Sequence, residues 1–436
     1  MNRRRLITAT SLAAAGGAAA AVTSAAAGPA GQSGPGQLPR LPVWTGLDRL
    51  VESGFAALAG QRVGVISNPT GMDRRYRHLV DLMHGSGQVQ VTGVFGPEHG
   101  FRGSAQAGGS EGTGIDARTG LTVYDAFGAS QTKWADLYAR AGVDTVVFDI
   151  QDVGARFYTY IWAMYDSMVA AARTGRRYVV LDRPNPIGGY AYGPMMTPAY
   201  TSGVGKREIV QQHGMTVGEL ARFYNVEFLP GVADGPVELE VIACRAWRGD
   251  LMAGDTDVPW VLPSPNMPTP DTALVYPGTC MFEGVSSISE GRGTTRPFEL
   301  VGGPAMDYHW GDRLNALGLP GVEFREAYFT PTFSKFTNQL CAGVEVKVTD
   351  RAAYDPIRTG VAMLVEARKY PSFTWRFDAF DPARPYWIDK LSGSPRLRTM
   401  INAGASVADA VGAWQEELAE FDARRQAYLL YPRAGR

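Results

Sequence analysis

The chain has 436 residues, which is enough for a large core and more than one domain. Its composition is ordinary for a soluble globular protein, and its formal net charge at pH 7 is only -1. It therefore lacks the basic surface that binding to nucleic acid or an anionic membrane requires, so we expect no nucleic-acid partner.

The N-terminal 30 residues predict an export signal. Arg3–Arg5 precede an Ala- and Gly-rich apolar run to about Val22, and Ala25–Ala27 supply small residues for cleavage. The paired arginines also fit the twin-arginine pattern. The apolar run is short and interrupted by glycine, so we expect no permanent membrane span. A disordered Ala-rich tail is the alternative. Residues 31–44 are predicted to form a linker, and the protein is expected outside the cell or in the cell envelope.

Strands and helices alternate through the next part of the chain, the pattern of a doubly wound parallel sheet. Thr216 and Glu219 have capping-box spacing at the start of the last of these helices. We expect a Rossmann-like α/β domain over 45–258, with strands over 62–67, 89–95, 121–124, 143–150, 177–182 and 237–244, and helices over 47–59, 76–84, 132–140, 160–174 and 215–225.

The remainder, 259–436, is expected to form a smaller α+β domain. Its first stretch, 259–277, is rich in proline and is predicted to exclude regular helix and to serve as an ordered connector. Further on, the pattern predicts a strand over 343–348 and helices over 356–369, 394–403 and 407–428.

The sequence contains no motif that is typical of cofactor or metal binding. NPTG, the turn after the first strand, is not GxGxxG, and no P-loop occurs, so no cofactor is expected. Neither HxH nor HExxH spacing is present, so no metal is expected. Cys244, Cys280 and Cys341 are predicted to be three buried thiols, although one disulfide is compatible with their number.

Four loops carry polar groups at the carboxyl ends of predicted strands, which meet at one edge of a parallel sheet. They are NPTG with Asn68, GPEHGFRG with Glu98, His99 and Arg102, DIQDVGARFYTY with Asp149, Asp152, Arg156 and Tyr158, and DRPNPIGG with Arg183 and Asn185. Their convergence predicts a functional site more strongly than any one motif.

Glu98 is the best candidate for a general acid, since a carboxyl group in a Gly-Pro turn beside His99 can acquire a raised pKa. A solvated glutamate, or one paired with Arg102, is the structural alternative. Asp149 or Asp152 could supply a second carboxylate that serves as base, nucleophile or charge stabiliser, or could instead cap a helix or pair with Arg156.

The arginines near these loops suit a carboxylate ligand. Arg156, Arg183 and Arg292 could hold one by bidentate contacts, although each could equally form an internal ion pair. Glu290, next to Arg292 in SEGRG, presents the same two alternatives. Tyr158 and the aromatic residues after it could stack on a sugar ring or line a core.

Long motifs in this chain resemble the exo-β-N-acetylmuramidases of the NamZ type. The resemblance covers roughly residues 45–432 and rests on GVISNPTG, GVFGPEHGFRG, VVFDIQDVGARFYTYIW, VLDRPNPIGG, PSPNMPTPDTALVYPGTCMFEG, SEGRGTTRPFELVG and DKLSGSPRLRTMINAG. It implies a Rossmann-like domain whose cleft is closed by the smaller domain, and removal of terminal β-linked N-acetylmuramic acid from peptidoglycan-derived muropeptides or disaccharides. It also implies that Glu98 is the catalytic carboxylate.

The substrate's lactyl carboxylate would account for several arginines at one edge. With Asp149 and Asp152 as candidate partners of Glu98, we expect the remaining polar residues of these motifs to bind substrate: Asn68, His99, Arg102, Arg156, Tyr158, Arg183, Asn185, Asn266, Glu290 and Arg292. A non-catalytic muropeptide- or sugar-binding protein of the cell envelope is the alternative function, and an amidase or esterase acting on the same polymer is a third. The sequence leaves open the oligomeric state and the choice between retention and inversion.

Overall fold

A seven-stranded sheet organises the first half of the chain. The computed structural model describes residues 40–433, which lie in one compact unit. The strand order is β3-β4-β2-β1-β5-β6-β9, and every neighbouring pair is parallel except β3 with β4. The strands are β1 (Arg62–Ser67), β2 (Gln90–Gly96), β3 (Gly114–Ile115), β4 (Thr122–Asp125), β5 (Thr145–Asp149), β6 (Arg177–Leu181) and β9 (Leu239–Ile242).

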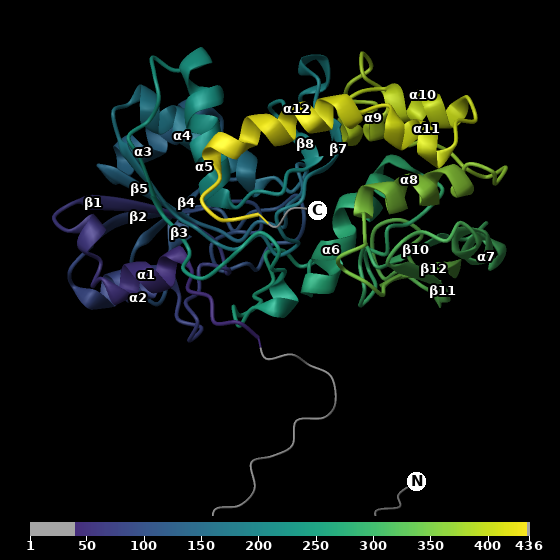
Figure 1. Cartoon of the computed structure of the whole chain (residues 1–436). Helices are drawn as coiled ribbons and strands as arrows, with labels where there is room; N and C mark the ends of the chain where they lie inside the picture. Colours follow the sequence, from purple (N-terminus) through teal and green to yellow (C-terminus); the bar gives the residue numbers. More distant parts are fainter. Residues whose placement is uncertain (1–39, 434–436) are drawn as a thin grey trace, which may run out of the picture. The chain divides into compact units, whose positions relative to one another are not determined.

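Helices cover both faces of this sheet (Figure 1). Alternate residues of β5 divide between two hydrophobic clusters: Val147 joins the cluster under α1 and α2, whereas Val146 and Phe148 join the cluster under α3, α4 and α5. The predicted doubly wound sheet is therefore confirmed. The bounds are α1 (Gly46–Glu52), α2 (Leu79–Ser86), α3 (Gln131–Ala141), α4 (Tyr160–Arg173) and α5 (Val217–Glu227).

The second half is built around a three-stranded antiparallel sheet in the order β10-β12-β11. A separate hairpin, β7 (Tyr192–Met195) with β8 (Val210–Gln212), precedes it in the chain. The remaining elements are α6 (Pro270–Thr279), β10 (Leu300–Gly303), α7 (His309–Ala316), β11 (Val322–Phe329), β12 (Cys341–Val348), α8 (Pro356–Ala367), α9 (Trp387–Ser392), α10 (Arg396–Asn402), α11 (Val407–Gly412) and α12 (Gln415–Arg425).

The C-terminal segment returns to the first sheet. Figure 1 shows α12 reaching back to α5, where Phe421 packs edge-on against Phe223 with ring centroids 5.8 Å apart. Beyond α12, the Tyr431 hydroxyl donates a hydrogen bond to Asp182 at the end of β6. The two halves are thereby joined by packing as well as by the connecting chain.

Most predicted elements are confirmed, with differences at their ends. The first helix stops at Glu52 because Gly54 and Phe55 adopt left-handed backbone angles. The second begins at Leu79, three residues later than predicted, since Tyr76 is left-handed and His78 caps the helix. The capping box of Thr216 and Glu219 is present. The final helix is divided at Trp414 into α11 and α12.

The prediction that 259–277 excludes regular helix is wrong, because α6 begins at Pro270. Thr269 caps this helix, and Pro270 occupies its first turn, where a missing N–H removes no intrahelical bond. Pro277 lies in the last turn, and the helix ends two residues later. The proline content therefore marks the limits of a helix.

All three cysteines are free and buried, as expected. The predicted export signal and most of the predicted linker lie outside the described residues. Within 40–433, no helix is long and apolar enough to cross a membrane. The division of the chain into domains at residue 258 stays a prediction.

Candidate active site

Glu98 is held by a loop that folds back on itself after β2. His99 adopts a left-handed backbone with φ of 70°, and its Nδ1 lies 3.0 Å from the carbonyl oxygen of Ala105. One carboxylate oxygen of Glu98 accepts the N–H of Gly108 at 2.8 Å. The other lies 3.4 Å from the hydroxyl of Thr159, the residue that precedes α4. The half-buried carboxylate thus faces the first turn of α4.

Two cavities meet at Glu98, and the same three residues, Glu98, Thr159 and Tyr160, line both. The larger has a volume of about 300 Å³ and is otherwise lined by Pro97, Ala126, Phe127, Gly128, Ala129, Trp134, Trp162, Ala163, Asp166, Gly203 and Lys206. The smaller, of about 160 Å³, is otherwise lined by Phe157, Tyr158, Val204, Tyr276, Cys280, Glu283, Arg292 and Leu391. The smaller cavity therefore joins loops of the first sheet to residues of the second half.

Arg292 brings a positive charge to the smaller cavity. Its guanidinium pairs with Glu283 at 2.6 Å and with Glu290 at 3.4 Å, and it lies over the ring of Phe298. Burial works to lower the pKa of Arg292, but the charge and hydrogen bond of Glu283 and the charge of Glu290 together outweigh it and raise that pKa. Of its two alternatives, Arg292 therefore shows the internal ion pair, as Arg183 does, but its side chain is one-fifth exposed and lines the cavity.

Glu290 lies behind Arg292 and not in the cavity wall. It is buried and pairs with Lys335 at 2.8 Å. Burial works to raise the pKa of Glu290, but Lys335 and Arg292 hold it below its ordinary value. Glu290 therefore helps to fix the guanidinium of Arg292.

Aromatic rings form another part of the smaller cavity. Tyr158 packs edge-on against Tyr160 and Tyr276, with centroid distances of 5.4 and 5.7 Å. The hydroxyl of Tyr160 donates to the carbonyl oxygen of Pro263 at 2.7 Å. That oxygen also lies 3.5 Å from Nδ2 of Asn68, so two predicted loops hold the connector in place. Asn266, in the same connector, is buried.

Asp149 and Arg183 form an ion pair inside the protein. Nε and Nη2 of Arg183 lie 2.5 and 2.9 Å from the two carboxylate oxygens, and both side chains are buried. Burial raises the pKa of Asp149 despite the adjacent guanidinium. Neither residue lines a cavity at Glu98. Of the two alternatives for Arg183, the structure therefore shows the internal ion pair.

Arg156 is fully buried and donates to the carbonyl oxygens of Pro194, Ile209 and Leu391 at 2.7–2.8 Å. Burial lowers its pKa to about 9. Its Nη atoms are committed to backbone carbonyls, so it holds three segments together and is not placed to bind a substrate carboxylate.

Asp152 does not pair with Arg156. Its Oδ2 accepts the N–H of Gly154 at 2.7 Å and contacts Nε2 of His213 at 3.1 Å. Its Oδ1 is buried and has no hydrogen-bond partner among residues 40–433. Asp152 lines neither cavity at Glu98.

The remaining predicted residues hold loops. Arg102 pairs with Asp116 and Asp81, so the suggested Glu98–Arg102 pair does not form. Asn185 donates to the carbonyl oxygen of Met215 and accepts the N–H of Ile187. Of the sequence candidates, Glu98, Tyr158 and Arg292 share a cavity wall.

Glu283 is the principal residue that the sequence analysis missed. It lines the smaller cavity with Glu98 and is the carboxylate partner of Arg292. Its local sequence, MFEG, carries no recognisable catalytic pattern. No spacing or local pattern in the sequence distinguishes it from other glutamates.

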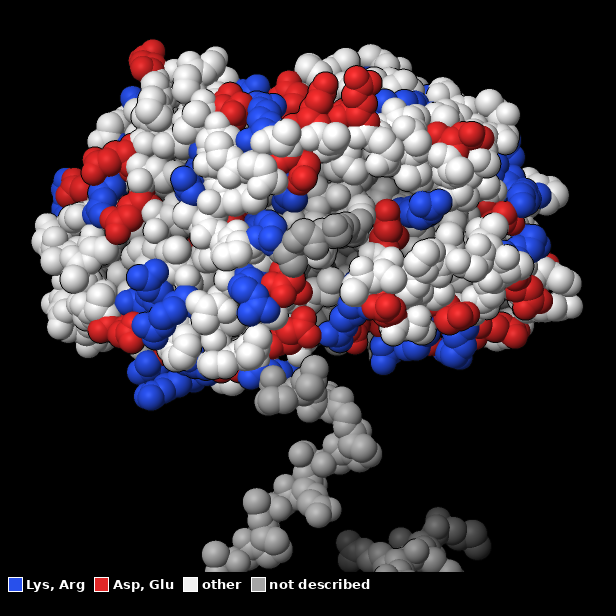
Figure 2. All heavy atoms as spheres, in the orientation of Figure 1, with Lys and Arg blue, Asp and Glu red and all other residues white. Residues whose placement is uncertain are grey.

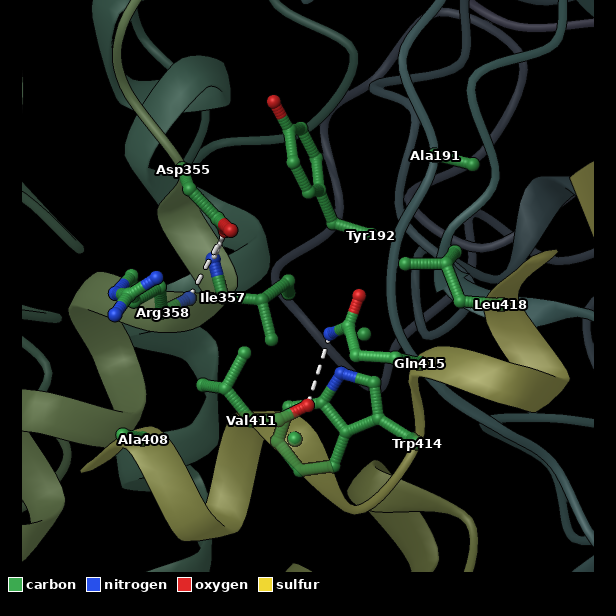
Figure 3. A pocket seen from close by; sticks show the side chains of 12 residues that line it. Ala191, Tyr192, Asp355, Ile357, Arg358, Ala408, Val411, Trp414, Gln415 and Leu418 are labelled. Carbon is green, nitrogen blue, oxygen red and sulfur yellow. Dashed lines mark hydrogen bonds between the residues drawn. The ribbon is translucent and has the colours of Figure 1, made fainter. Parts of the chain in front are cut away.

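Another cavity, of about 420 Å³, lies away from Glu98, between Tyr192, α8, α11 and α12 (Figure 3). No candidate residue from the sequence lines it.

Charges of both signs are interspersed on the face shown in Figure 2. Within residues 40–433, no group of three or more His, Cys, Asp or Glu side chains could hold a metal ion.

Comparison with known proteins gives concordant matches. Residues 63–271 and 274–431 match the family models described as the N-terminal and C-terminal parts of exo-β-N-acetylmuramidase NamZ. The peptidoglycan β-N-acetylmuramidase NamZ of Bacillus subtilis (strain 168) is 42% identical over 392 residues, which cover 89% of this chain and 91% of that protein.

Two crystal structures of DUF1343 family proteins from Bacteroides fragilis are also similar. Each is 31% identical and is matched over 90% of this chain and 100% of its own, with TM-scores of 0.78 and 0.72. Their likeness supports the α/β fold described above.

Proposed function

The chain belongs to the NamZ exo-β-N-acetylmuramidase family of glycoside hydrolases, and on this basis we propose that it removes terminal β-linked N-acetylmuramic acid from peptidoglycan fragments. The observation that carries the proposal is the position of Glu98. It lies in a wall shared by two cavities, and Arg292 lines one of them. This arrangement offers a proton donor and a cation to a carboxylate-bearing sugar.

Glu98 acts as the general acid in this proposal. Its carboxyl group gives a proton to the glycosidic oxygen as the bond from that oxygen to the anomeric carbon breaks. The Gly108 N–H and the Thr159 hydroxyl orient the carboxyl group. Water then supplies the hydroxyl group of the released sugar and a proton that restores Glu98.

Arg292 binds the lactyl carboxylate, and Glu283 supplies the second carboxylate. Arg292 suits this role because a guanidinium recognises a carboxylate through paired hydrogen bonds. Glu283 lines the same cavity as Glu98 and approaches from the other half of the chain. The rings of Tyr158 and Tyr276 pack against the sugar. Asp149 and Asp152 take structural roles in this scheme.

The N-terminal pattern of Arg3–Arg5, an apolar run and small residues supports a further part of the proposal, that the protein is exported. An exported enzyme would meet peptidoglycan fragments outside the cytoplasm.

The test is the variant Glu98→Gln, assayed with a chromogenic β-N-acetylmuramide. Glutamine keeps the size of the side chain but has no carboxyl proton to give, so we expect kcat to fall by ~10² or more. Glu227→Gln, on α5 and outside both cavities, is the matched control and should keep wild-type kcat. Wild-type turnover by a folded Glu98→Gln variant, or binding of the sugar by wild type without hydrolysis, would refute the proposal.

A further inference from the structure

The loop that carries Glu98 closes on a second carboxylate, Glu111, which has no part in the proposed mechanism. Both of its carboxylate oxygens accept hydrogen bonds from the earlier part of the loop. Oε2 accepts the N–H of Arg102 at 3.1 Å, and Oε1 accepts the N–H and the hydroxyl of Ser104 at 2.8 and 2.9 Å. The carboxylate therefore joins the two ends of the segment 104–111.

The backbone beside Glu111 is shaped to receive this side chain. Gly100 has a φ of 86°, in the left-handed region that favours glycine. A Cβ atom at Gly100 would lie 2.2 Å from Cδ of Glu111, so no larger residue fits while Glu111 keeps its place. Burial works to raise the pKa of Glu111, but hydrogen bonds from Ser104 and from neighbouring backbone N–H groups outweigh it and lower that pKa. Glu111 is therefore a charged acceptor with fixed donors, although the residue is exposed.

The closed segment presents Gly108 to Glu98. The N–H of Gly108 donates to Oε1 of Glu98 at 2.8 Å, and the carbonyl oxygen of Gly109 accepts the N–H of His99 at 3.0 Å. A segment that contains glycine has many conformations open to it unless its ends are tied. Glu111 follows Gly109 by two residues, so its hydrogen bonds to the start of the segment fix the direction of the Gly108 N–H.

We propose that Glu111 is a positioning residue for the general acid: by closing the segment 104–111, it holds Gly108 against Oε1 of Glu98. The proposal rests on the proposed function of Glu98. Because Oε1 accepts the Gly108 N–H, the proton that Glu98 transfers is carried by Oε2, on the side of Thr159. A displacement of about 1 Å at a reacting group can cost ~10² in rate. Glu111 lines neither cavity at Glu98, so it acts on the reaction through this loop.

The test compares two substrates that differ in their need for the acid. In the disaccharide of β-N-acetylmuramic acid linked to N-acetylglucosamine, the leaving oxygen takes a proton. In β-N-acetylmuramyl fluoride, the leaving group departs as fluoride ion and takes none. A residue that positions the acid therefore matters for the disaccharide alone. We expect Glu111→Ala to lower kcat/KM for the disaccharide about ten-fold or more, and to leave that for the fluoride within about two-fold.

Two further variants keep the test interpretable. Glu111→Gln keeps the length of the side chain and one acceptor oxygen for Ser104, so it should show the same selectivity with a smaller loss. It also tests the proposal if Glu111→Ala does not fold. Glu52→Ala is the matched control, because Glu52 is another exposed glutamate with a fixed partner, Arg245 at 3.0 Å. It lies at the end of α1, outside both cavities, and its loss should leave both substrates unaffected.

The outcomes separate the role of Glu111 from that of Glu98. Equal losses on both substrates, or no loss on either, in folded variants at Glu111 would overturn the positioning role and leave the muramidase activity of wild type established. Failure of wild type to cleave the disaccharide, or an equal loss on both substrates in Glu98→Gln, would overturn the acid role of Glu98 and this inference with it.

Discussion

Asp182 should make the protein less stable as the pH rises from about 4 to 7. This carboxyl group lies at the end of β6, fully buried, and accepts hydrogen bonds from Thr216 and Gly218 at 2.8 Å and from Tyr431. Burial raises its pKa to about 7, from an ordinary value of 3.8, although the hydrogen bond from Tyr431 works in the opposite direction.

The sign follows from comparing the two states. Between these two pKa values the folded chain holds a proton on Asp182 that the unfolded chain has released, so rising pH favours unfolding. The contribution of Asp182 to the free energy of unfolding is fully present below about pH 4. It is lost as the pH rises through the pKa of about 7 that Asp182 has in the folded protein. At about 1.36 kcal/mol for each unit between the two pKa values, the full loss is about 4 kcal/mol.

The assay is urea denaturation of wild type and Asp182→Asn at pH 5 and pH 8. Asparagine resembles the protonated acid in shape and lack of charge, so the variant should lack this dependence on pH. We expect the free energy of unfolding of wild type relative to the variant to fall by about 2–3 kcal/mol between the two pH values. A difference that stays constant between pH 5 and pH 8 would refute the reasoning, because Asp182 would then titrate alike in both states.

Two further substitutions test the assignment of structural and binding roles. Asp149→Asn leaves Arg183 buried without its charge partner, so we expect a loss of about 3–5 kcal/mol in the free energy of unfolding, measured by urea denaturation. The kcat of the folded enzyme should be nearly unchanged. A ~10²-fold fall in kcat at unchanged stability would instead make Asp149 catalytic. Arg292→Gln should raise KM for a β-N-acetylmuramide by about ten-fold or more. It should have little effect on KM for the matching β-N-acetylglucosaminide, which has no lactyl group. An equal effect on both glycosides would contradict the contact between Arg292 and the lactyl carboxylate.

Local sequence was sufficient for the central sheet. The strands β1, β5 and β6 are continuous apolar runs, as expected for strands buried on both faces, and their order brings the polar loops to one edge. Hydrogen bonds join these loops directly: Ser67 donates to the Asp149 carbonyl, and the N–H of Gln151 donates to Thr70. Adjacent parallel strands made this convergence predictable.

The roles of individual charged residues were not predictable in the same way. Arg156 looks from its neighbours like any loop arginine, but its partners Ile209 and Leu391 lie 53 and 235 residues away. Glu283 and Arg292 reach the cavity of Glu98 from the other half of the chain. Contacts at such separations depend on packing between elements that a local pattern does not encode.

The contact between Tyr431 and Asp182 has a consequence for how the protein is made. During synthesis, β6 leaves the ribosome about 250 residues before Tyr431 does, so the hydrogen bond at its end stays unformed until translation is nearly finished. The first sheet can collapse early, but it reaches its final state only when the last residues arrive. Loss of these residues, as by a late stop codon, should therefore weaken the sheet that was translated first.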